Sequence, residues 1–485
     1  MIPTLLPTDF LAIAPELALL AGVLLLLGMT MYRVNRTYWF EFVALLTVIA
    51  ALATTLLDFA PGFAFTGALQ VNPFNLLITR IFLLAGFLTI AVSHEYLDSL
   101  GQGSGEYYIL LLFSLLGMGL MVKAADLLLL IIGLETMSLS IYVLVGLFRS
   151  SPKANESAIK YYLMGAVATG VTLFGVAFVF GACDTTSLPA IGAIGPGLKG
   201  NQALFLTFGL GLIFVGLAFK VAAFPFQMWV PDVYEGALTT ITGFMSTGVK
   251  AAAFAALLNV FYNYTSLLSA RWEPVLWVVA VGTMTYGNVL AIAQTNIKRM
   301  LAFSSIAHAG YLLVAVTALA AGGDATTVSA LVYYLTVYLF MNIGAFAIVA
   351  ALRKGANEFL HLDEYRGLAR THPWPALALT IILFSLAGIP ITGGFLVKFY
   401  VFSAAINAKL IGLAIIGVLN SAISVYYYLR VTVYMYMRTD DADLVTEKVP
   451  STVSAVVLAC LLMILLMGLM PSWFIPLGSY IAAVP

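Results

Sequence analysis

Residues 217–229 read LAFKVAAFPFQMW, an apolar stretch that contains one lysine, Lys220, and one proline, Pro225. A lysine is costly in the hydrocarbon core of a bilayer. A proline removes a hydrogen bond from the ladder of a helix. Together they predict a membrane-spanning helix that is broken at the proline and faces protein or water there.

The composition of the whole chain is that of a membrane protein. Its 485 residues are 62% hydrophobic and 9% charged, with a mean hydropathy of +1.03. Soluble domains are about 45–50% apolar and about 25% charged. The sequence therefore predicts an all-α polytopic membrane protein in a lipid bilayer and excludes a water-soluble fold.

Hydropathy predicts about fourteen membrane-spanning helices, each long enough to cross about 30 Å of hydrocarbon. Only short polar turns separate them, so residues 1–485 are expected to form a single membrane domain. The predicted spans are 11–29, 39–57, 75–96, 107–123, 126–148, 157–182, 203–228, 237–261, 275–295, 300–320, 327–351, 374–404, 409–437 and 452–476.

The distribution of loop cations predicts the orientation. Most of them fall in alternate loops, namely Arg33, Arg36, Arg149, Lys153, Lys298, Arg299, Arg353, Lys354, Arg366, Arg370, Arg438 and Lys448. The opposite loops hold Lys123, Lys199, Arg271 and Lys409. The positive-inside rule places the cation-rich loops in the cytoplasm and both termini outside. The first apolar stretch has no preceding cation and carries Glu16, so it is expected to be a retained helix.

A second interrupted apolar stretch, residues 385–400, reads SLAGIPITGGFLVKFY and contains Pro390 ahead of Lys398. The two breaks fall in the seventh and twelfth predicted helices. A repeat of five helices re-enters the membrane upside down, as in the inverted repeats of transporters. We therefore expect two inverted five-helix repeats and a separate C-terminal helix, at residues 107–261, 275–437 and 452–476.

Several ionisable residues lie within the predicted spans, where each costs about 2.5–3.5 kcal/mol at the bilayer centre. Glu135 lies near the middle of LLLLIIGLETMSLSIYVLVG, and Lys250 lies near the centre of the helix after the first break. A structural role stays open for Glu135, and a helix-end anchor stays open for Lys398. As a set with Lys220, these residues favour proton transfer, because burial disfavours a charged ammonium and a nearby carboxylate favours it.

Further candidates have alternatives of comparable weight. His308, in SSIAHAGYLL, can carry a proton near neutral pH, but a lone helical histidine is often only hydrogen-bonded. Glu156 and Lys160 are four residues apart on one helix face, so an ordinary ion pair and a proton-transfer role are equally open. If Glu135 and Lys220 face one another, moving the carboxylate away from the ammonium would help the lysine to release its proton.

No motif for redox, nucleotide or metal chemistry occurs in the sequence. Cys183 and Cys460 lie far apart without C-x-x-C spacing, and neither a Walker A motif nor a G-x-G-x-x-G motif is found. No cofactor or metal is therefore expected on this chain. Lys+Arg and Asp+Glu are balanced at 22 each, so no basic stripe favours nucleic acid. The energy for transport must come from an ion gradient or a partner.

Four motifs in a fixed order resemble the antiporter-like subunits of respiratory complex I, a NADH:quinone oxidoreductase. They are LAFKVAAFPFQMWVPDVYEGA (217–237), GNVLAIAQTNIKRMLAFSSIAHAGYLL (287–313), SLAGIPITGGFLVKFYVF (385–402) and SAISVYYYLR (421–430). The chain is most similar to subunit N, the bacterial counterpart of mitochondrial subunit 2. The M-type subunit carries a glutamate where Lys398 stands, and the L-type subunit is much longer. The chain departs from the family pattern at Gln227, where relatives often have histidine, and at Val397, where they have glycine.

The resemblance implies a proton-translocating subunit in the bacterial cytoplasmic (inner) membrane, driven by quinone reduction elsewhere. Its proton-transfer residues would be Glu135, Lys220, Lys250, His308 and Lys398, with Glu156 and Lys160 matching the acid and base of the sixth helix. Flavin, iron–sulfur clusters and quinone would belong to partner subunits. The implied partners are the M-type subunit, the K-type small subunit and the lateral helix of the L-type subunit. A Mrp-type cation/proton antiporter component is the alternative, because it would share the fold and the lysines.

Overall fold

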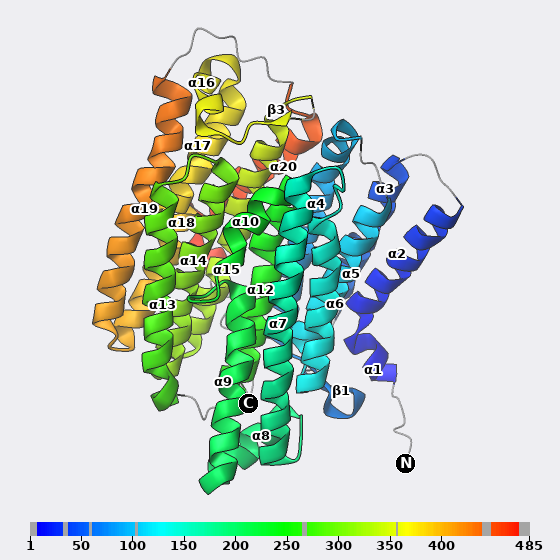
Figure 1. The fold of residues 1–485 in the computed structure, drawn as a ribbon, viewed down its shortest axis with the longest axis vertical. Coiled ribbons are helices and arrows are strands. Elements are labelled where there is room, and N and C mark those ends of the chain that lie inside the picture. Colours follow the sequence, from blue (N-terminus) through cyan, green and yellow to red (C-terminus); the bar gives the residue numbers. More distant parts are fainter. Residues whose placement is uncertain are drawn as a thin grey trace.

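The computed structural model describes residues 7–32, 37–57, 61–101, 105–263, 269–355, 357–438 and 448–474. Its helices run side by side along one long axis (Figure 1). Twelve helices in this part of the chain are long and apolar enough to cross a membrane. The prediction of an all-α polytopic membrane protein is therefore confirmed.

The elements follow one another with short connections. The longer helices are α2 (Ala14–Met31), α3 (Thr37–Thr54), α4 (Pro73–Ser99), α5 (Gly105–Lys123), α6 (Leu127–Val145), α7 (Pro152–Cys183), α9 (Gly200–Val221), α13 (Ser269–Ile292), α14 (Ile297–Ala320), α15 (Ala325–Ala351), α19 (Ile411–Met437) and α20 (Ser451–Leu469). The shorter helices are α1 (Pro7–Ala12), α8 (Leu188–Ile194), α10 (Trp229–Gly236), α11 (Thr239–Phe244), α12 (Lys250–Leu258), α16 (Leu368–Thr371), α17 (Pro373–Ala387) and α18 (Gly393–Asn407). Two small antiparallel hairpins pair β1 (Gly62–Ala64) with β2 (Leu69–Val71) and β3 (Arg353–Lys354) with β4 (Asn357–Glu358).

Two predicted spans differ from single continuous α-helices. The span predicted at 374–404 consists of α17 and α18, which are separated by five residues outside any helix. The span predicted at 237–261 consists of α11 and α12, joined by a π-helical turn at Met245–Val249. The interruption between α17 and α18 agrees with the break predicted at Pro390. The π-helical turn was not predicted, because residues 245–249 contain no proline and hydropathy does not distinguish a π-helical from an α-helical turn. The count of fourteen spans stays a prediction.

The breaks form where the backbone leaves the helical region. The residue after α9, Ala222, has φ +65°, and the following Pro225 has no N–H to continue the ladder. The residue after α17, Gly388, has φ +89°. Across this second break, Gly394 N–H donates to Ser385 Oγ at 3.1 Å. A Cβ at Gly394 would lie 1.8 Å from Ser385 O, so only glycine allows this close approach.

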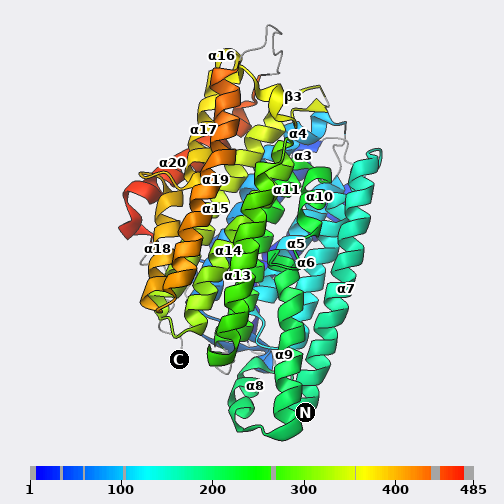
Figure 2. The same cartoon turned by 60° about the vertical axis from the view of Figure 1, so that its left-hand side comes forward.

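The connections gather at two opposite ends of the bundle. β3 and α16 lie at one end, and β1 and α8 lie at the other (Figures 1 and 2). We call the first the cation-rich end, because the segments with most of the predicted cytoplasmic cations meet there. For example, Ile297 N–H at the start of α14 donates to Leu360 O at 2.8 Å. Arg33 and Arg36 lie outside the described residues.

Three cations that were predicted to lie in loops are buried. Lys123 is 0% exposed, forms an ion pair with Glu16 at 2.8 Å and donates to Ala12 O at 2.9 Å. Lys298 and Arg353 are 2% and 7% exposed. These residues stand at element ends that neighbouring helices cover. Hydropathy locates such ends along the chain but does not show what packs over them.

Candidate functional site

Four predicted proton-transfer residues are buried in the bundle. Lys220 is the last residue but one of α9, and Lys250 begins α12. His308 lies within α14 and Lys398 lies on α18. Their exposed fractions are between 1% and 4%. The fifth, Glu135 on α6, is half-buried. The chain therefore keeps three lysines away from its surface, where each ammonium depends on protein groups for its hydrogen bonds.

Lys220 is bound by hydroxyl groups of α6. Its Nζ donates to Ser138 Oγ at 2.7 Å and to Tyr142 OH at 3.1 Å. It also lies 5.2 Å from the centroid of the Tyr142 ring, within cation–π range. Near the break, Phe219 O accepts a hydrogen bond from Trp229 Nε1 and not from this ammonium.

Glu135 lies one helical turn before Ser138 on α6, and its carboxylate accepts a hydrogen bond from Thr169 Oγ1 on α7 at 2.5 Å. Among the described residues, no ion pair within 4.0 Å joins Glu135 to Lys220. The direct contact considered from sequence is thus absent in this conformation. Glu135 lies on α6, and the two hydroxyl groups that bind Lys220 belong to the same helix.

Lys250 and His308 belong to two hydrogen-bonded groups that meet at the adjacent residues Ser304 and Ser305 of α14. Lys250 Nζ donates to both the carbonyl oxygen and Oγ of Ser305, each at 2.6 Å. The preceding residue, Ser304, hydrogen-bonds to Tyr428 OH. Tyr428 OH lies 3.2 Å from His308 Nε2, and Tyr334 OH lies 2.7 Å from His308 Nδ1. Both imidazole nitrogens therefore have partners that can accept or donate a proton.

Lys398 lies at the second helix break. Its Nζ donates to Leu386 O and Ala387 O at 2.9 Å each and to Ser421 Oγ at 3.0 Å. The carbonyl groups are the last ones of α17, which have no partner within their own helix. The lysine therefore satisfies the helix end that the break exposes.

A second polar cluster lies between Lys398 and the His308 cluster. Lys398 Nζ lies 5.2 Å from the centroid of the Tyr311 ring. Tyr311 OH accepts from Asn288 Nδ2 at 3.0 Å, and Asn288 Oδ1 accepts from Tyr427 OH at 3.0 Å. Tyr427 precedes Tyr428, the partner of His308. Polar side chains thus extend from Lys250 to Lys398, the lysine at the second break.

Several buried polar atoms near these clusters have no hydrogen-bond partner. They are both amide atoms of Gln227, Tyr338 OH and Asn342 Oδ1. Tyr338 is the ring beside Lys250, at 5.8 Å from its Nζ. Buried polar groups are almost always satisfied by protein or by ordered water.

Glu156 and Lys160 lie in a different setting, on the surface of α7. Lys160 Nζ lies 2.6 Å from Glu156 and 3.0 Å from Asp232, and Arg299 Nη1 lies 2.7 Å from Asp232 and 2.8 Å from Glu235. Asp232 and Glu235 both belong to α10. Within the described residues, no hydrogen bond or ion pair joins Glu156 or Lys160 to the buried lysines.

The acids of α10 are held in their charged form by this network. Burial raises the pKa of Asp232, but hydrogen bonds from Arg299 and Lys160 outweigh it and lower the pKa overall. Burial likewise raises the pKa of Glu235, and hydrogen bonds from Lys153 and Arg299 lower it below the ordinary value. Both carboxyls are therefore ionised near neutral pH and tie α10 to α7 and α14.

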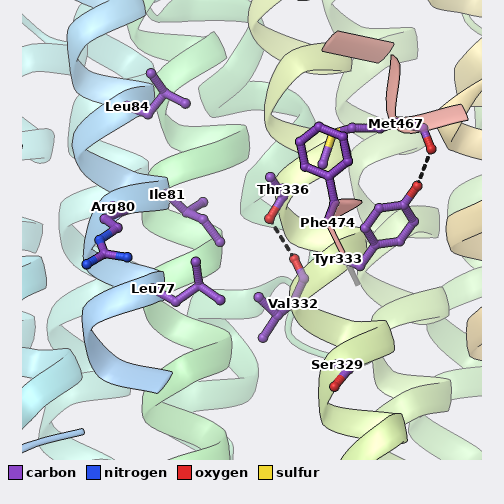
Figure 3. Close-up of a pocket in the computed structure, with 10 residues that line it drawn as sticks. All are labelled: Leu77, Arg80, Ile81, Leu84, Ser329, Val332, Tyr333, Thr336, Met467 and Phe474. Atoms are coloured by element: carbon purple, nitrogen blue, oxygen red, sulfur yellow. Dashed lines mark hydrogen bonds between the residues drawn. The ribbon is translucent and has the colours of Figure 1, made fainter. Parts of the chain in front are cut away.

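An apolar groove between α4, α15 and α20 lies apart from these residues (Figure 3). Leu77, Val332 and Phe474 are among its lining residues. The aliphatic part of the Arg80 side chain lines the groove. Its guanidinium donates to Thr55 Oγ1 at 3.1 Å and to Thr55 O at 2.6 Å. Arg80 is thus bound at the end of α3.

Some partners in the site were missed from sequence. Ser138 and Tyr142 follow Glu135 by three and seven residues, which places all three on one face of α6. That spacing of polar residues in an apolar helix was the available signal. Tyr334 and Tyr428 carry no such signal, because aromatic residues are common in membrane helices. In the described part of the chain, no group of three His, Cys, Asp or Glu residues is placed to hold a metal ion.

The fold and its buried charges define a class, the antiporter-like membrane proteins. The family described as "NADH:quinone oxidoreductase/Mrp antiporter, TM" matches residues 124–424. This range contains every candidate proton-transfer residue.

The relatives define the family more narrowly. The chain is 41% identical over 488 residues to NADH-quinone oxidoreductase subunit N 1 of Solibacter usitatus, covering 99% of each chain. It is 45% identical over 409 residues to NADH-quinone oxidoreductase subunit N of Trichlorobacter lovleyi, covering 84% of this chain and 83% of that one. The chain belongs to the subunit N family of NADH-quinone oxidoreductases.

Solved structures share the fold. A chain of respiratory complex I from Thermus thermophilus with bound aureothin matches with a TM-score of 0.81 and 32% identity, covering 95% of this chain and 98% of that chain. A chain of the Mrp complex from Dietzia sp. matches with a TM-score of 0.83 but 20% identity, covering 98% and 97%. The second likeness shows only that the fold is shared.

Proposed function

We propose that this subunit translocates protons through a buried axis of Glu135, Lys220, Lys250, His308 and Lys398. The observation that carries this proposal is the burial of three lysines whose partners are hydroxyls, carbonyls and tyrosine rings. None of the three forms an ion pair within the described residues. A buried ammonium without a counter-charge is expensive and is readily exchanged for the neutral amine.

The chemistry at each lysine is proton exchange between ammonium and amine. Lys250 would pass its proton through the serine and tyrosine hydroxyls near His308, which accepts it on one nitrogen and releases it from the other. The proton would then pass through the cluster of Asn288 and Tyr311 to Lys398. Lys398 would release the proton on the opposite side of the membrane. In this proposal the chain carries no redox centre, and the energy comes from quinone reduction in subunits that hold the flavin and iron–sulfur clusters.

We also propose that residues 107–261 and 275–437 are inverted repeats. Each begins with two closely packed helices. A Cβ at Gly117 on α5 would lie 2.3 Å from Met137 N on α6, and a Cβ at Gly287 on α13 would lie 2.5 Å from Ala307 N on α14. Each also contains one helix break with a buried lysine beside it. The lysine precedes the break in the first and follows it in the second, so the lysines are not equivalent by position.

Glu156 and Lys160 are better explained as a structural tie than as proton carriers. Their side chains are 64% and 44% exposed, and they extend the ion network that binds α10. An exposed pair of this kind is screened by water and contributes little to stability. Its value here lies in positioning α10, which follows the break next to Lys220.

The assembly proposed around this chain is the membrane part of a bacterial NADH-quinone oxidoreductase. Its neighbours would be the M-type subunit, the K-type small subunit and the lateral helix of the L-type subunit. Half-exposed Glu135 supports a neighbour on α6, because a carboxylate facing lipid is costly. We propose the bacterial inner membrane as the location, with the cation-rich end in the cytoplasm and both termini outside.

A Mrp-type cation/proton antiporter component remains the second candidate, because the Dietzia chain has the same fold. Sequence identity favours subunit N, at 41% against 20%. Sodium–proton exchange by this chain without redox partners would support the antiporter candidate instead.

The deciding experiment replaces Lys250 by methionine in the complete complex. Purified complex in proteoliposomes is driven with NADH and quinone, and proton pumping is measured. We expect K250M to lower the pumping rate at least about 100-fold at the proton-transfer step, the usual effect of losing a positioned acid or base. Lys199→Met, at an exposed lysine before α9, should pump as wild type. Normal pumping by K250M would show that the axis does not carry protons.

A further inference from the structure

A polar cavity opens among the connections at the cation-rich end, away from the five axis residues. It has a volume of about 250 Å³. The end of α4, the turn between α10 and α11, the start of α14 and the strand β4 all line it. Its charged lining residues are Lys153, Glu235, Lys298 and Glu358. A cavity of this size and polarity holds several water molecules.

Three charged side chains of the cavity are largely buried, namely Lys298, Glu235 and Glu358, and Glu235 is already paired with Lys153 and Arg299. Lys298 Nζ donates to Ala237 O at 2.6 Å and lies 3.9 Å from Glu358 Oε2. Lys298 and Glu358 are 2% and 12% exposed at the side chain. The axis described above uses neither of them.

One oxygen of Glu358 is left without a partner. Oε2 accepts a hydrogen bond from Thr239 Oγ1 at 2.9 Å, whereas Oε1 is buried and has no hydrogen-bond partner. A carboxylate oxygen with no partner in a polar cavity needs either water or a proton. Nearby Lys298 and Lys153 limit the cost of the negative charge, and Lys153 also pairs with Glu235.

Thr239 connects this carboxylate to the axis. It is the first residue of α11, and Thr242, Ser246 and Lys250 follow it at intervals of three, four and four residues. Thr239 and Thr242 share one face of α11, and this face leads through Ser246 in the π-helical turn to Lys250 at the start of α12. All four are at most 3% exposed. The face extends about 16 Å at 1.5 Å per residue, and the π-helical turn Met245–Val249 lies just before the lysine.

We infer that Glu358 is a proton-loading carboxylate that serves Lys250, with Lys298 as its positioning residue. This inference rests on the proposed function. A proton from water in the cavity binds Glu358 Oε1 and gives a carboxylic acid. Water and the hydroxyls along α11 then carry a proton to the amine of Lys250, which becomes an ammonium, and the carboxylate is restored. Only protons move, so no oxidant or reductant is required.

The test is Glu358→Gln in the complete complex, reconstituted in proteoliposomes and driven with NADH and quinone. Losing a positioned proton carrier slows transfer by about 100-fold, and cavity water restores part of this, so we expect pumping about tenfold below wild type. Asp363→Asn is the matched control. It removes an exposed carboxylate five residues further along, which forms an ion pair with Arg366. It should pump as wild type.

Comparison with Lys250→Met separates the two proposals. If K250M stops pumping and E358Q pumps normally, the loading role of Glu358 is wrong and the axis stands. If both variants pump normally, the axis itself is wrong and the loading role falls with it.

If the Glu358→Gln variant does not assemble into the complex, infrared spectroscopy provides a second test of the proposal. Infrared difference spectra of the working wild-type complex should contain the C=O band of a transient carboxylic acid, and Glu358→Asp should shift that band. A spectrum that is identical in the wild-type and Asp forms would overturn the inference.

Discussion

The ammonium of Lys398 donates to the carbonyl oxygen of Ala387 across the break between α17 and α18, at 2.9 Å. Together with Leu386 O and Ser421 Oγ it has three acceptors, one for each N–H of a charged lysine. A neutral amine has only two N–H groups. Loss of the proton therefore releases one acceptor, and the charge of Lys398 is linked to the geometry of the helix break.

This linkage predicts that Lys398→Met abolishes proton pumping and also destabilises the break between α17 and α18. The variant loses the exchangeable proton and leaves two helix-end carbonyls without their donor, at about 1–3 kcal/mol for each buried group. We expect pumping to be lost and the thermal stability of the purified complex to fall. Lys398→Arg restores donors but not easy deprotonation, because arginine stays charged. It should recover stability without pumping, and recovery of pumping by the arginine form would contradict the linkage.

The close approach at the same break gives a prediction about folding. In Gly394→Ala the new Cβ would meet Ser385 O at 1.8 Å, and backbone cannot move aside cheaply. Overpacking of this kind costs about 1–3 kcal/mol or more, so we expect a marked loss of assembled complex. Gly412→Ala, at a helical glycine with no neighbouring atom within 4 Å, is the control. The measurement is the amount of subunit that co-purifies with the complex, and equal yields of both variants would refute the steric argument.

The hydroxyl cage of Lys220 can be tested without removing the lysine. Ser138→Ala removes an acceptor at 2.7 Å, and Tyr142→Phe removes one at 3.1 Å while keeping the ring. A lost hydrogen bond to a buried charge costs about 1.5–3 kcal/mol. We expect each variant to pump more slowly and the double variant to be worse than either. Ser140→Ala on the same helix, whose hydroxyl bonds to Thr136 O, should have no effect on pumping.

Sequence predicts the position of the buried charges better than their partners. Apolar runs locate the helices, and a lysine or glutamate within such a run has a high energetic cost in the membrane. The burial of Lys220, Lys250 and Lys398 was therefore predictable. Their hydrogen bonds come from residues 55 to 82 positions away in the first two cases, and only the packing of helices brings these together. Sequence also cannot show that Lys298 and Lys123, at helix ends, are covered by neighbouring elements.

The ion network around α10 predicts how stability responds to acid. Arg299 lowers the pKa of both Asp232 and Glu235, against the effect of burial. Acids with a lowered pKa in the folded state bind fewer protons than in the unfolded state. Their contribution is therefore complete above the unfolded values of about 4 and is lost as the pH falls through the lower folded values.

Arg299→Ala should remove most of this contribution. At pH 7 the variant complex is expected to unfold at a lower temperature than the wild type. The difference should shrink as the pH falls below about 4, where both acids take up protons in either form. Thermal unfolding in detergent between neutral and acid pH measures it. Arg370→Ala, at an exposed arginine of α16 on the same end, controls for loss of surface charge. A difference that stays constant with pH would mean that Arg299 acts through packing and not through the two carboxylates.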